Sequence, residues 1–392
     1  MSRFVDTGGV TTTIRAAVFE GPRRPLSLEE LALDDPGPGE VRVRMVASGV
    51  CHSDLHVVDG EWARPAGLVL GHEGAGIVDA LGPGVPERDG EAPLGAGGLR
   101  VGDLVVLAWT APCDACVACR RGEPWLCLEP RGAGHRLAPA LVRLHRQDGR
   151  PVGAYSGIGT FSTGQVVAAK AAIPIDPRTP PEIAALIGCA VTTGVGAIRN
   201  TARVRPGDSV VVIGAGGVGL AAIMAATDAG ADPLVVIERE PAKRQRALSA
   251  GATHVLTADE VVDAPAEASD PIRRLMRSGA DVVVEAIGLV ETVELALALT
   301  RSGGTTVLVG MTPQADRAPI DVYRFVEDGR RLLGSNYGSA IPSRDFPAIA
   351  SGYLDGSLPL DLLVSQRIGL DGLDGAFDAM RERRGARQVV IF

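Results

Sequence analysis

An alternation of apolar runs and helical patterns in the second half of the chain constrains the fold most strongly. Between about Val191 and Leu333, runs such as SVVVIG, PLVVIE and TTVLVG alternate with amphipathic patterns such as GLAAIMAATDAG and PAKRQRALSAG. Continuous apolar strands separated by helices are typical of a doubly wound parallel sheet, whose strands are buried on both faces. We therefore predict an α/β domain over residues 191–333.

The segments before and after this region have a different pattern of apolar and polar residues. Residues 15–110 are short β-type runs broken by Gly and Pro, which indicates a mainly antiparallel, loop-rich domain. The pattern after residue 333 is mixed. We predict one mainly β domain over 1–190 that the chain re-enters over 334–392, with the α/β domain inserted. A polar insertion over 86–100 and a long irregular segment over 128–159 are expected at its surface.

Composition excludes several classes of protein. The 392 residues are 46% hydrophobic, which is too apolar for a disordered chain. The formal net charge of −8 does not favour binding to negatively charged phosphate backbones, so we expect no nucleic-acid partner. No apolar run reaches about 18 residues without Gly, Pro or charge, so no membrane span is predicted. The N-terminal run MSRFVDTGGVTTT lacks the features of an export signal, and we expect a cytoplasmic location.

The run VVVIGAGGVGLAAIMAA predicts a dinucleotide site. It contains G-x-G-x-x-G directly after a buried strand and at the start of a helix. The first glycine permits the tight turn, the second permits close approach of a pyrophosphate, and the third permits helix–sheet packing. The helix N-terminus supplies N–H groups and a positive dipole end. The predicted cofactor-binding residues of this turn are Gly214, Gly216, Gly217, Val218 and Gly219.

The next strand, PLVVIE, ends in Glu238, close to the offset of about 20 residues expected for a ribose-binding carboxylate. This acid favours NAD, because it would repel a 2′-phosphate. The neighbouring Arg239 leaves NADP open, since an arginine there can serve that phosphate. Lys243 is one of only two lysines in the chain, and we expect it to reach back toward the ribose.

Four of the six cysteines form a compact cluster with C-x2-C-x2-C-x7-C spacing. Four thiolates within fifteen residues can close a tetrahedral zinc site with no open position, which is the pattern of a structural zinc. Disulfides are disfavoured in a reducing compartment, and an iron–sulfur cluster is disfavoured by the polar flanking residues. The predicted ligands are Cys113, Cys116, Cys119 and Cys127.

The other metal-ligating residues are far apart in the chain. Cys51 lies in GVCHSDLH, His72 and Glu73 in LGHEGAG, and Cys189 in GCAVTTG. Two thiolates and one imidazole with an open fourth position describe a catalytic zinc. Spacing alone does not join these residues, and Cys189 by itself, on an apolar helix, fits a buried structural cysteine better than a metal ligand.

The motifs GVCHSDLH, GHEGAG, the four-cysteine lobe, GCAVTTG and GAGGVG, in this order, resemble the zinc-containing medium-chain alcohol dehydrogenase family. The likeness covers nearly the whole chain. It implies a GroES-like catalytic domain, with the structural-zinc lobe at 111–130, joined to a Rossmann domain. Each subunit would hold one catalytic zinc, one structural zinc and NAD. The long lobe resembles that of the dimeric members, which implies a homodimer.

The resemblance also implies roles for individual residues. Cys51, His72 and Cys189 would bind the catalytic zinc, with Glu73 behind the metal and Asp54 orienting His72. A substrate alcohol would replace zinc-bound water, have its pKa lowered by the metal and give hydride to the nicotinamide. The resemblance further implies a proton relay from Ser53 through the nicotinamide ribose to His56. Thr193 would pack against the nicotinamide. Arg387 would contact the pyrophosphate, and so would His52, at a position where relatives often carry arginine.

The substrate pocket is carried over by position, with Trp62, Trp109 and Phe161 around the channel to the zinc. Such a pocket would suit medium-chain or aromatic primary alcohols, oxidised reversibly to aldehydes. An alternative within the family is a thiol-dependent formaldehyde dehydrogenase acting on an S-hydroxymethyl adduct. It would need charged groups at the pocket mouth, where Glu61 and Arg64 are candidates. A non-catalytic NAD or zinc sensor is a further alternative, but it would be marked by loss of a ligand or relay residue, and all are present.

Overall fold

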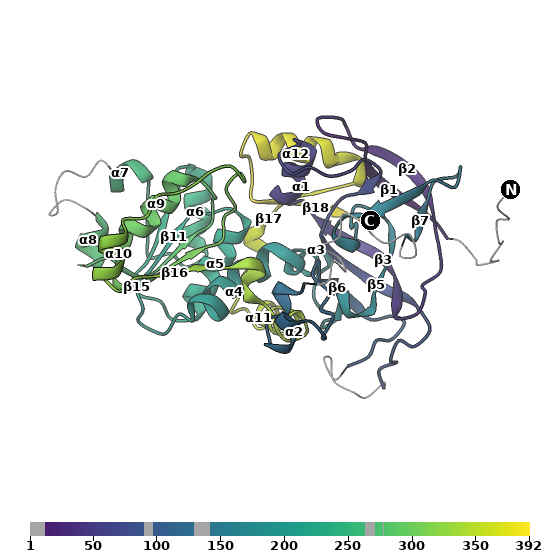
Figure 1. Ribbon diagram of the computed structural model, residues 1–392, viewed down its shortest axis with the longest axis horizontal. Coiled ribbons are helices and arrows are strands. Elements are labelled where there is room, and N and C mark those ends of the chain that lie inside the picture. Colours follow the sequence, from purple (N-terminus) through teal and green to yellow (C-terminus); the bar gives the residue numbers. More distant parts are fainter. Residues whose placement is uncertain (1–11, 90–96, 129–141, 263–270, 277) are drawn as a thin grey trace. The chain divides into compact units, whose positions relative to one another are not determined.

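The computed structural model describes residues 12–89, 97–128, 142–262, 271–276 and 278–392. These residues form two compact units (Figure 1). The first unit comprises residues 1–188, 367–382 and 389–392, and the second comprises 189–366 and 383–388. The predicted insertion at 86–100 and the lobe at 111–130 are thus described only in part, and the N-terminal run lies outside the described residues.

The first unit is built from antiparallel strands, as predicted for residues 15–110. Five strands close a barrel in the order β1-β2-β7-β8-β4, and a seven-stranded sheet has the order β10-β6-β5-β3-β18-β17 with β9 on β3. Alternating burial along β3 shows why these segments form strands, since every second side chain enters a core. The strands are β1 (Thr12–Phe19), β2 (Ser27–Leu33), β3 (Glu40–Gly49), β4 (Leu68–Val69), β5 (Glu73–Leu81), β6 (Leu104–Leu107), β7 (Leu144–His145), β8 (Pro151–Ala154), β9 (Gly164–Ala168), β10 (Ala172–Pro174), β17 (Val364–Ile368) and β18 (Arg387–Ile391).

Short helices join or cover these strands. They are α1 (His52–Val58), α2 (Val117–Arg120), α3 (Pro181–Leu186) and α12 (Leu373–Arg381). Helix α3 begins a continuous helical run over Pro181–Ala202 that is long and apolar enough to cross a membrane by length and composition. However, 83% of its apolar window is buried inside the protein, as expected of a core helix.

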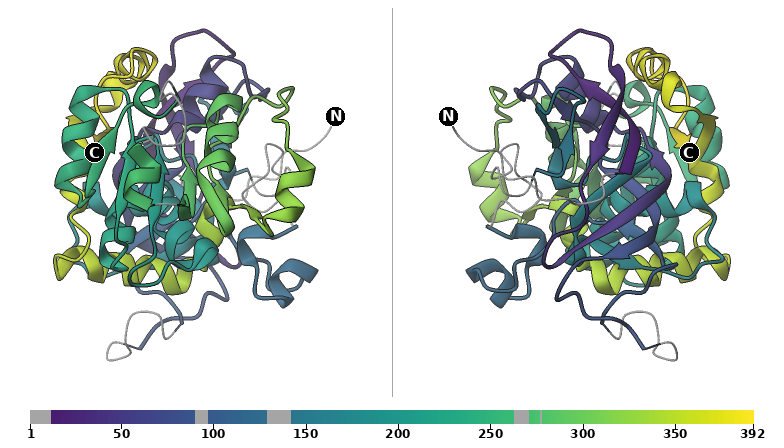
Figure 2. Two further views of the ribbon diagram at one scale, coloured as in Figure 1. Left: turned by 90° about the vertical axis from the view of Figure 1, so that its left-hand side faces the viewer. Right: turned by 90° about the vertical axis from the view of Figure 1, so that its right-hand side faces the viewer.

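The second unit is the predicted doubly wound sheet. Six parallel strands have the order β13-β12-β11-β14-β15-β16, with helices on both faces (Figure 1; Figure 2, left). The order reverses at β11, so β11 and its neighbour β14 flank the switch point where such sheets bind ligands. The strands are β11 (Val210–Ile213), β12 (Leu234–Ile237), β13 (His254–Leu256), β14 (Ala280–Glu285), β15 (Thr300–Leu308) and β16 (Arg331–Gly334).

All four residues of β11 are buried, which matches the continuous apolar pattern of a central parallel strand. The helices of this unit are α4 (Thr192–Gly196), α5 (Gly217–Asp228), α6 (Pro241–Ser249), α7 (Ala258–Val262), α8 (Pro271–Met276), α9 (Val290–Leu299), α10 (Val322–Glu327) and α11 (Pro342–Leu354).

The return to the first domain was expected at residue 334, and the two compact units divide the chain differently from that residue on. The chain stays in the second unit until residue 366, and 383–388 belongs to it again. The segment after β16 packs within that unit, because Asn200 Nδ2 donates to Gly338 O at 3.1 Å and to Asp345 Oδ2 at 3.2 Å. These contacts join residues about 140 positions apart, so no local pattern signals them. The other boundary, at 188, lies two residues from the predicted one.

Phe161, which we expected around the substrate channel, lies in the core of the first unit. Its side chain is 0% exposed and belongs to a cluster that includes Phe19, Leu55 and Phe377. The Phe161 and Phe377 rings meet edge to face with centroids 6.4 Å apart. This aromatic pair fixes α12 against the barrel side of the unit.

Replacing Phe161 by Ala should therefore destabilise the protein by about 3–5 kcal/mol, because it leaves a cavity in a closed cluster. The measurement is the denaturant midpoint of the purified protein. Leu28→Ala, at a side chain that is 44% exposed, is the matched control and should change stability by less than about 0.5 kcal/mol. An unchanged midpoint in Phe161→Ala would contradict a stabilising role of this ring in the core.

Candidate active site and metal centres

The four residues expected around the catalytic zinc come together. One ligand atom from each of Cys51, His72, Glu73 and Cys189 lies within 4.8 Å of the others. Cys51 stands directly before α1, His72 and Glu73 stand at the start of β5, and Cys189 follows Gly188 in the helical run that α3 begins. The donor set of two thiolates, one imidazole and one carboxylate is typical of zinc.

Asp54 holds this group in place from a fully buried position. Its Oδ1 accepts hydrogen bonds from His72 Nδ1 at 3.0 Å and from Gly71 N at 3.1 Å. Its Oδ2 accepts from Cys51 N at 3.3 Å and so caps α1. Because Nδ1 is engaged, His72 presents Nε2 to the metal, which is the arrangement of a carboxylate that orients a histidine ligand.

Two glycines allow β3 and the helical run over Pro181–Ala202 to pack closely against their neighbours. A Cβ at Gly49 would collide with Glu73 Oε2, and a Cβ at Gly188 would lie 3.1 Å from Leu107 O. Close packing of β3, β5 and β6 against the helical run therefore requires small residues here. It brings Cys189, the residue after Gly188, to the same place as His72.

The four clustered cysteines also have the geometry of a zinc site. The Sγ atoms of Cys113 and Cys119 are 3.9 Å apart, and those of Cys116 and Cys127 are 4.0 Å apart. Tetrahedral zinc with Zn–S bonds of about 2.3 Å would place its sulfurs about 3.8 Å apart. The distances are far too long for disulfides, whose S–S bond is about 2.05 Å, and none of the four cysteines forms one.

Backbone N–H groups point at the sulfurs of this lobe. Cys116 Sγ accepts from the N–H groups of Cys119 and Leu128, which lower the pKa of the Cys116 thiol to about 6. Partial burial raises the pKa of Cys119 to about 12. A metal must displace the Cys119 proton, so zinc affinity of the lobe should fall as the pH falls.

The glycine turn after β11 shows where the protein itself requires glycine and where it does not. Gly214 has φ +93°, and a Cβ there would lie 2.6 Å from Ile287 Cγ1. A Cβ at Gly219 would collide with Gly214 O. A Cβ at Gly216, in contrast, would meet no protein atom within 4 Å. The space beside Gly216 fits the pyrophosphate of a dinucleotide, which the second glycine of this motif admits.

Arg387 lies at the same turn, because a Cβ at Gly217 would collide with its Nε. Its side chain is buried at the N-terminus of α5. A guanidinium and a helix N-terminus together attract the negative charge of a phosphate. Val218 lies in the first turn of α5, and α4, which carries Thr193, packs against this helix because Gly194 approaches Val218 O.

Glu238 is 8% exposed at the end of β12. Its Oε2 accepts from Ala215 N at 2.8 Å and its Oε1 from Glu240 N at 3.0 Å, so the carboxylate is fixed beside the glycine turn. Each oxygen keeps a further lone pair for a ribose hydroxyl. Arg239 is exposed, with its Nε 3.7 Å from Glu240, and Lys243 lies in the first turn of α6.

One aromatic ring contacts the metal group, and the two tryptophans expected at the pocket lie against other residues. The Tyr155 ring meets the His72 ring edge to face at 5.7 Å, and burial raises the pKa of Tyr155. The Trp62 ring stacks on His56 at 4.7 Å. Trp109 follows β6 and packs partly against the core. Our sequence analysis did not find Tyr155, because it lies in a segment without a motif.

Comparisons with known proteins agree with this geometry. Residues 37–177 match the family model of the alcohol dehydrogenase GroES-like domain, and 217–353 match that of the zinc-binding dehydrogenase. An S-(hydroxymethyl)glutathione dehydrogenase of Haemophilus influenzae is 34% identical over 387 residues, which are 97% of this chain and 98% of that protein.

Two solved structures are similar over nearly their whole length. An alcohol dehydrogenase zinc-binding domain protein from Burkholderia ambifaria has a TM-score of 0.90 and 31% identity, covering 98% of this chain and 100% of its own. Benzyl alcohol dehydrogenase from Acinetobacter calcoaceticus has a TM-score of 0.86 and 29% identity, covering 97% and 99%.

The chain therefore belongs to the zinc-dependent medium-chain alcohol dehydrogenase family. It is an NAD-dependent oxidoreductase with a GroES-like domain and a Rossmann domain, and its cofactors are zinc and NAD. The two cysteine-containing groups could each hold a metal ion, and the turn after β11 leaves the space beside Gly216 that a dinucleotide pyrophosphate needs.

The two metal groups should be separable by substitution. We expect two zinc ions per chain in the wild-type protein, one in Cys116→Ser, one in Cys51→Ala and none in the double variant, measured by elemental analysis. In Cys116→Ser the lobe should also be cleaved faster by a protease, because a closed zinc site stabilises the fold around it directly. Two retained zinc ions in either single variant would contradict the ligand assignment.

Proposed function

We propose that this enzyme oxidises medium-chain or aromatic primary alcohols to aldehydes, reversibly and with NAD. The observation that carries the proposal is the buried Cys51–His72–Cys189 group with an aromatic ring, Tyr155, against its histidine. Zinc bound there would act as a Lewis acid on the alcohol oxygen, and NAD would accept the hydride. An apolar, aromatic surround favours substrates with an apolar tail over small polar alcohols.

The chain's own polar residues would carry the proton away. Ser53 and His56 lie in α1, whose N-terminus follows the ligand Cys51. His56 is half-buried, and its side chain is 23% exposed, so it can take up a proton on one side and release it to solvent on the other. His52, at the first position of α1, is exposed and would face the cofactor phosphates with a weaker charge than an arginine.

NAD is favoured over NADP by the fixed carboxylate of Glu238. A 2′-phosphate at the ribose would meet this buried negative charge. Arg239, which could compensate it, is turned toward Glu240 instead. Lys243 and Arg387 remain as cationic side chains for the ribose and the pyrophosphate, and Thr193 for the nicotinamide.

A second candidate function is oxidation of the S-hydroxymethyl adduct of a thiol such as glutathione. Arg64 favours it, because its guanidinium lies 5.8 Å from the centre of the Tyr155 ring, the same ring that contacts His72. Arg64 Nη1 donates to Ala63 O at 2.7 Å, whereas its buried Nε has no hydrogen-bond partner among the described residues. An anionic substrate group would satisfy it.

A panel of substrates distinguishes the two functions. We expect NADH formation at 340 nm from benzyl alcohol, cinnamyl alcohol and octanol with kcat/KM values at least about tenfold above ethanol, because each buried methylene adds about 0.8 kcal/mol. NADP should be used poorly. Activity confined to formaldehyde with added glutathione would contradict the alcohol proposal and support the thiol adduct.

Arg64→Met tests the second candidate on the same panel. If Arg64 binds an anionic group, this substitution lowers kcat/KM for the glutathione adduct while leaving that for benzyl alcohol unchanged. The matched control is Arg120→Met, which removes an exposed charge in the zinc lobe. Equal effects on both substrates would exclude the anion-binding role of Arg64.

We also propose that the enzyme is a homodimer, supported by an exposed apolar surface on the second unit. Within the described residues β16 pairs only with β15, and its Leu333 is exposed. The neighbouring helix α10 has no buried residue, and Val322, Tyr323 and Val326 are 68%, 74% and 73% exposed. An unpaired edge strand beside such a patch suits a second copy of the chain related by a twofold axis. A cytoplasmic location is supported by six cysteines that form no disulfide.

This proposal predicts a sedimentation mass of twice the chain mass. Tyr323→Glu/Val326→Glu should shift the protein to a monomer, because charges would be buried in the interface. Val101→Glu, at an apolar residue of the first unit that is 58% exposed, should remain dimeric. A monomeric wild-type protein, or an unchanged dimer in the double variant, would exclude this surface.

A further inference from the structure

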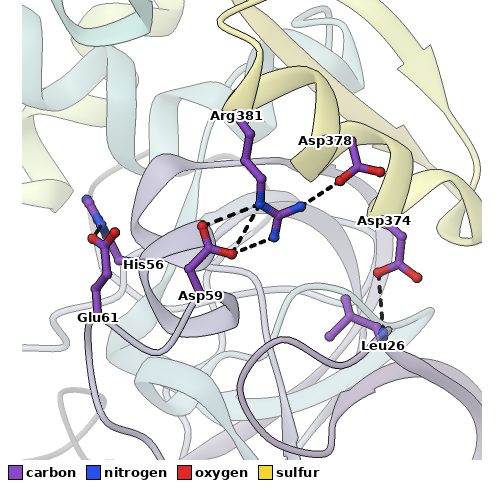
Figure 3. A network of polar contacts seen from close by, with 7 residues as sticks. All are labelled: Leu26, His56, Asp59, Glu61, Asp374, Asp378 and Arg381. Atoms are coloured by element: carbon purple, nitrogen blue, oxygen red, sulfur yellow. Dashed lines mark hydrogen bonds and ion pairs between the residues drawn. The ribbon is translucent and has the colours of Figure 1, made fainter.

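The side chain of His56 is held on three sides near the end of α1. Its Nδ1 lies 2.5 Å from Glu61 Oε2 (Figure 3). The Trp62 ring stacks on its face with centroids 4.7 Å apart, and the His52 ring meets it edge to face at 5.1 Å. Since the carboxylate engages Nδ1, the imidazole keeps Nε2 as its only other proton-accepting atom.

The turn that carries Glu61 is built to return to His56. Gly60 has φ +83°, which reverses the chain directly after α1, and Trp62 N donates to His56 O at 3.0 Å. The preceding Asp59 is tied to α12, because Arg381 Nη2 donates to Asp59 Oδ1 at 2.5 Å (Figure 3). The position of Glu61 therefore follows from the backbone and from a second helix, and not only from its own ion pair.

Glu61 is more exposed to water than His56. The His56 side chain is 23% exposed, whereas that of Glu61 is 56% exposed and open to water. An exposed ion pair of this kind adds little to folding stability. The contact is thus poorly explained as a stabilising element of the fold, although it is well placed to act on the chemistry of His56.

We propose that Glu61 is a positioning residue for His56 in alcohol oxidation; this rests on the proton-relay role given to His56 above. Glu61 fixes the tautomer in which Nδ1 carries the hydrogen and Nε2 accepts the proton that leaves the substrate side. When Nε2 is protonated, the Nδ1 proton passes to Glu61 Oε2 and from there to water. One proton enters at Nε2 and one leaves from Nδ1, so the imidazole is neutral again but is left as the Nε2–H tautomer. Loss of the Nε2 proton and uptake of a proton at Nδ1 from water through Glu61 then restore the starting Nδ1–H tautomer.

The test is the stopped-flow rate of proton release during the first turnover of benzyl alcohol with NAD, followed with a pH indicator. Glu61→Gln should slow proton release by about tenfold, because an amide neither fixes the tautomer nor accepts the proton. The KM for NAD and the zinc content should not change. Glu61→Asp should restore part of the rate, and added imidazole buffer should restore it in Glu61→Gln, as expected when an external base replaces a relay.

Two further variants make the result decisive. Asp378→Asn removes another exposed carboxylate of the same network, one that pairs with Arg381 and not with His56, and should leave the rate unchanged (Figure 3). His56→Asn should slow proton release, and adding Glu61→Gln to it should have no further effect.

The outcomes separate the inference from its premise. If His56→Asn slows proton release and Glu61→Gln does not, Glu61 is only a surface partner and the inference is overturned. If His56→Asn itself has no effect, the relay role of His56 fails, and the role of Glu61 fails with it. The alcohol dehydrogenase activity would stand in both cases.

Discussion

The catalytic metal group depends on one buried carboxylate. Asp54 accepts hydrogen bonds from Cys51 N, Gly71 N and His72 Nδ1, and so joins the start of α1 to the segment that precedes β5. A carboxylate without partners would be costly to bury, and these three donors, one of them on a metal ligand, offset that cost. Because the same side chain caps the helix and orients the imidazole, the local fold and the ligand geometry cannot vary independently.

The dinucleotide turn follows from steric limits of the same kind. Gly214 is required by its positive φ and Gly219 by its contact with Gly214 O, whereas Gly216 faces open space. Glu238 accepts a hydrogen bond from Ala215 N, so the acid that we propose for the ribose is fixed to the turn that we propose for the phosphates. The switch point between β11 and β14 therefore presents a prearranged surface to NAD, and little ordering is left to the moment of binding.

Parts of this site were readable from short stretches of sequence, and parts were not. The spacing of Cys113, Cys116, Cys119 and Cys127 predicts its own geometry, because ligands within fifteen residues need only a local loop to meet. The place of Phe161 was not readable from the sequence, since the surroundings of a side chain on a loop depend on what packs around it, and the structure puts this ring in a buried cluster with Phe19 and Phe377. Tyr155 had no sequence signal, because it meets His72 only when distant segments pack together. The Glu61–His56 contact had none either, because it depends on the exact turn at Gly60.

The sequence by itself determined the two kinds of secondary-structure pattern, the glycine turn, the acid after β12 and the compact cysteine lobe. Each of these is encoded by period or spacing over a few tens of residues, so local physics is sufficient. Tertiary structure alone decided that Cys189 joins Cys51 and His72, that the chain remains in the second unit to residue 366, and that Arg387 lies on Gly217. Those outcomes depend on close packing between distant segments. Small residues such as Gly188 allow this packing, but a glycine in the sequence does not indicate which segment will pack against it.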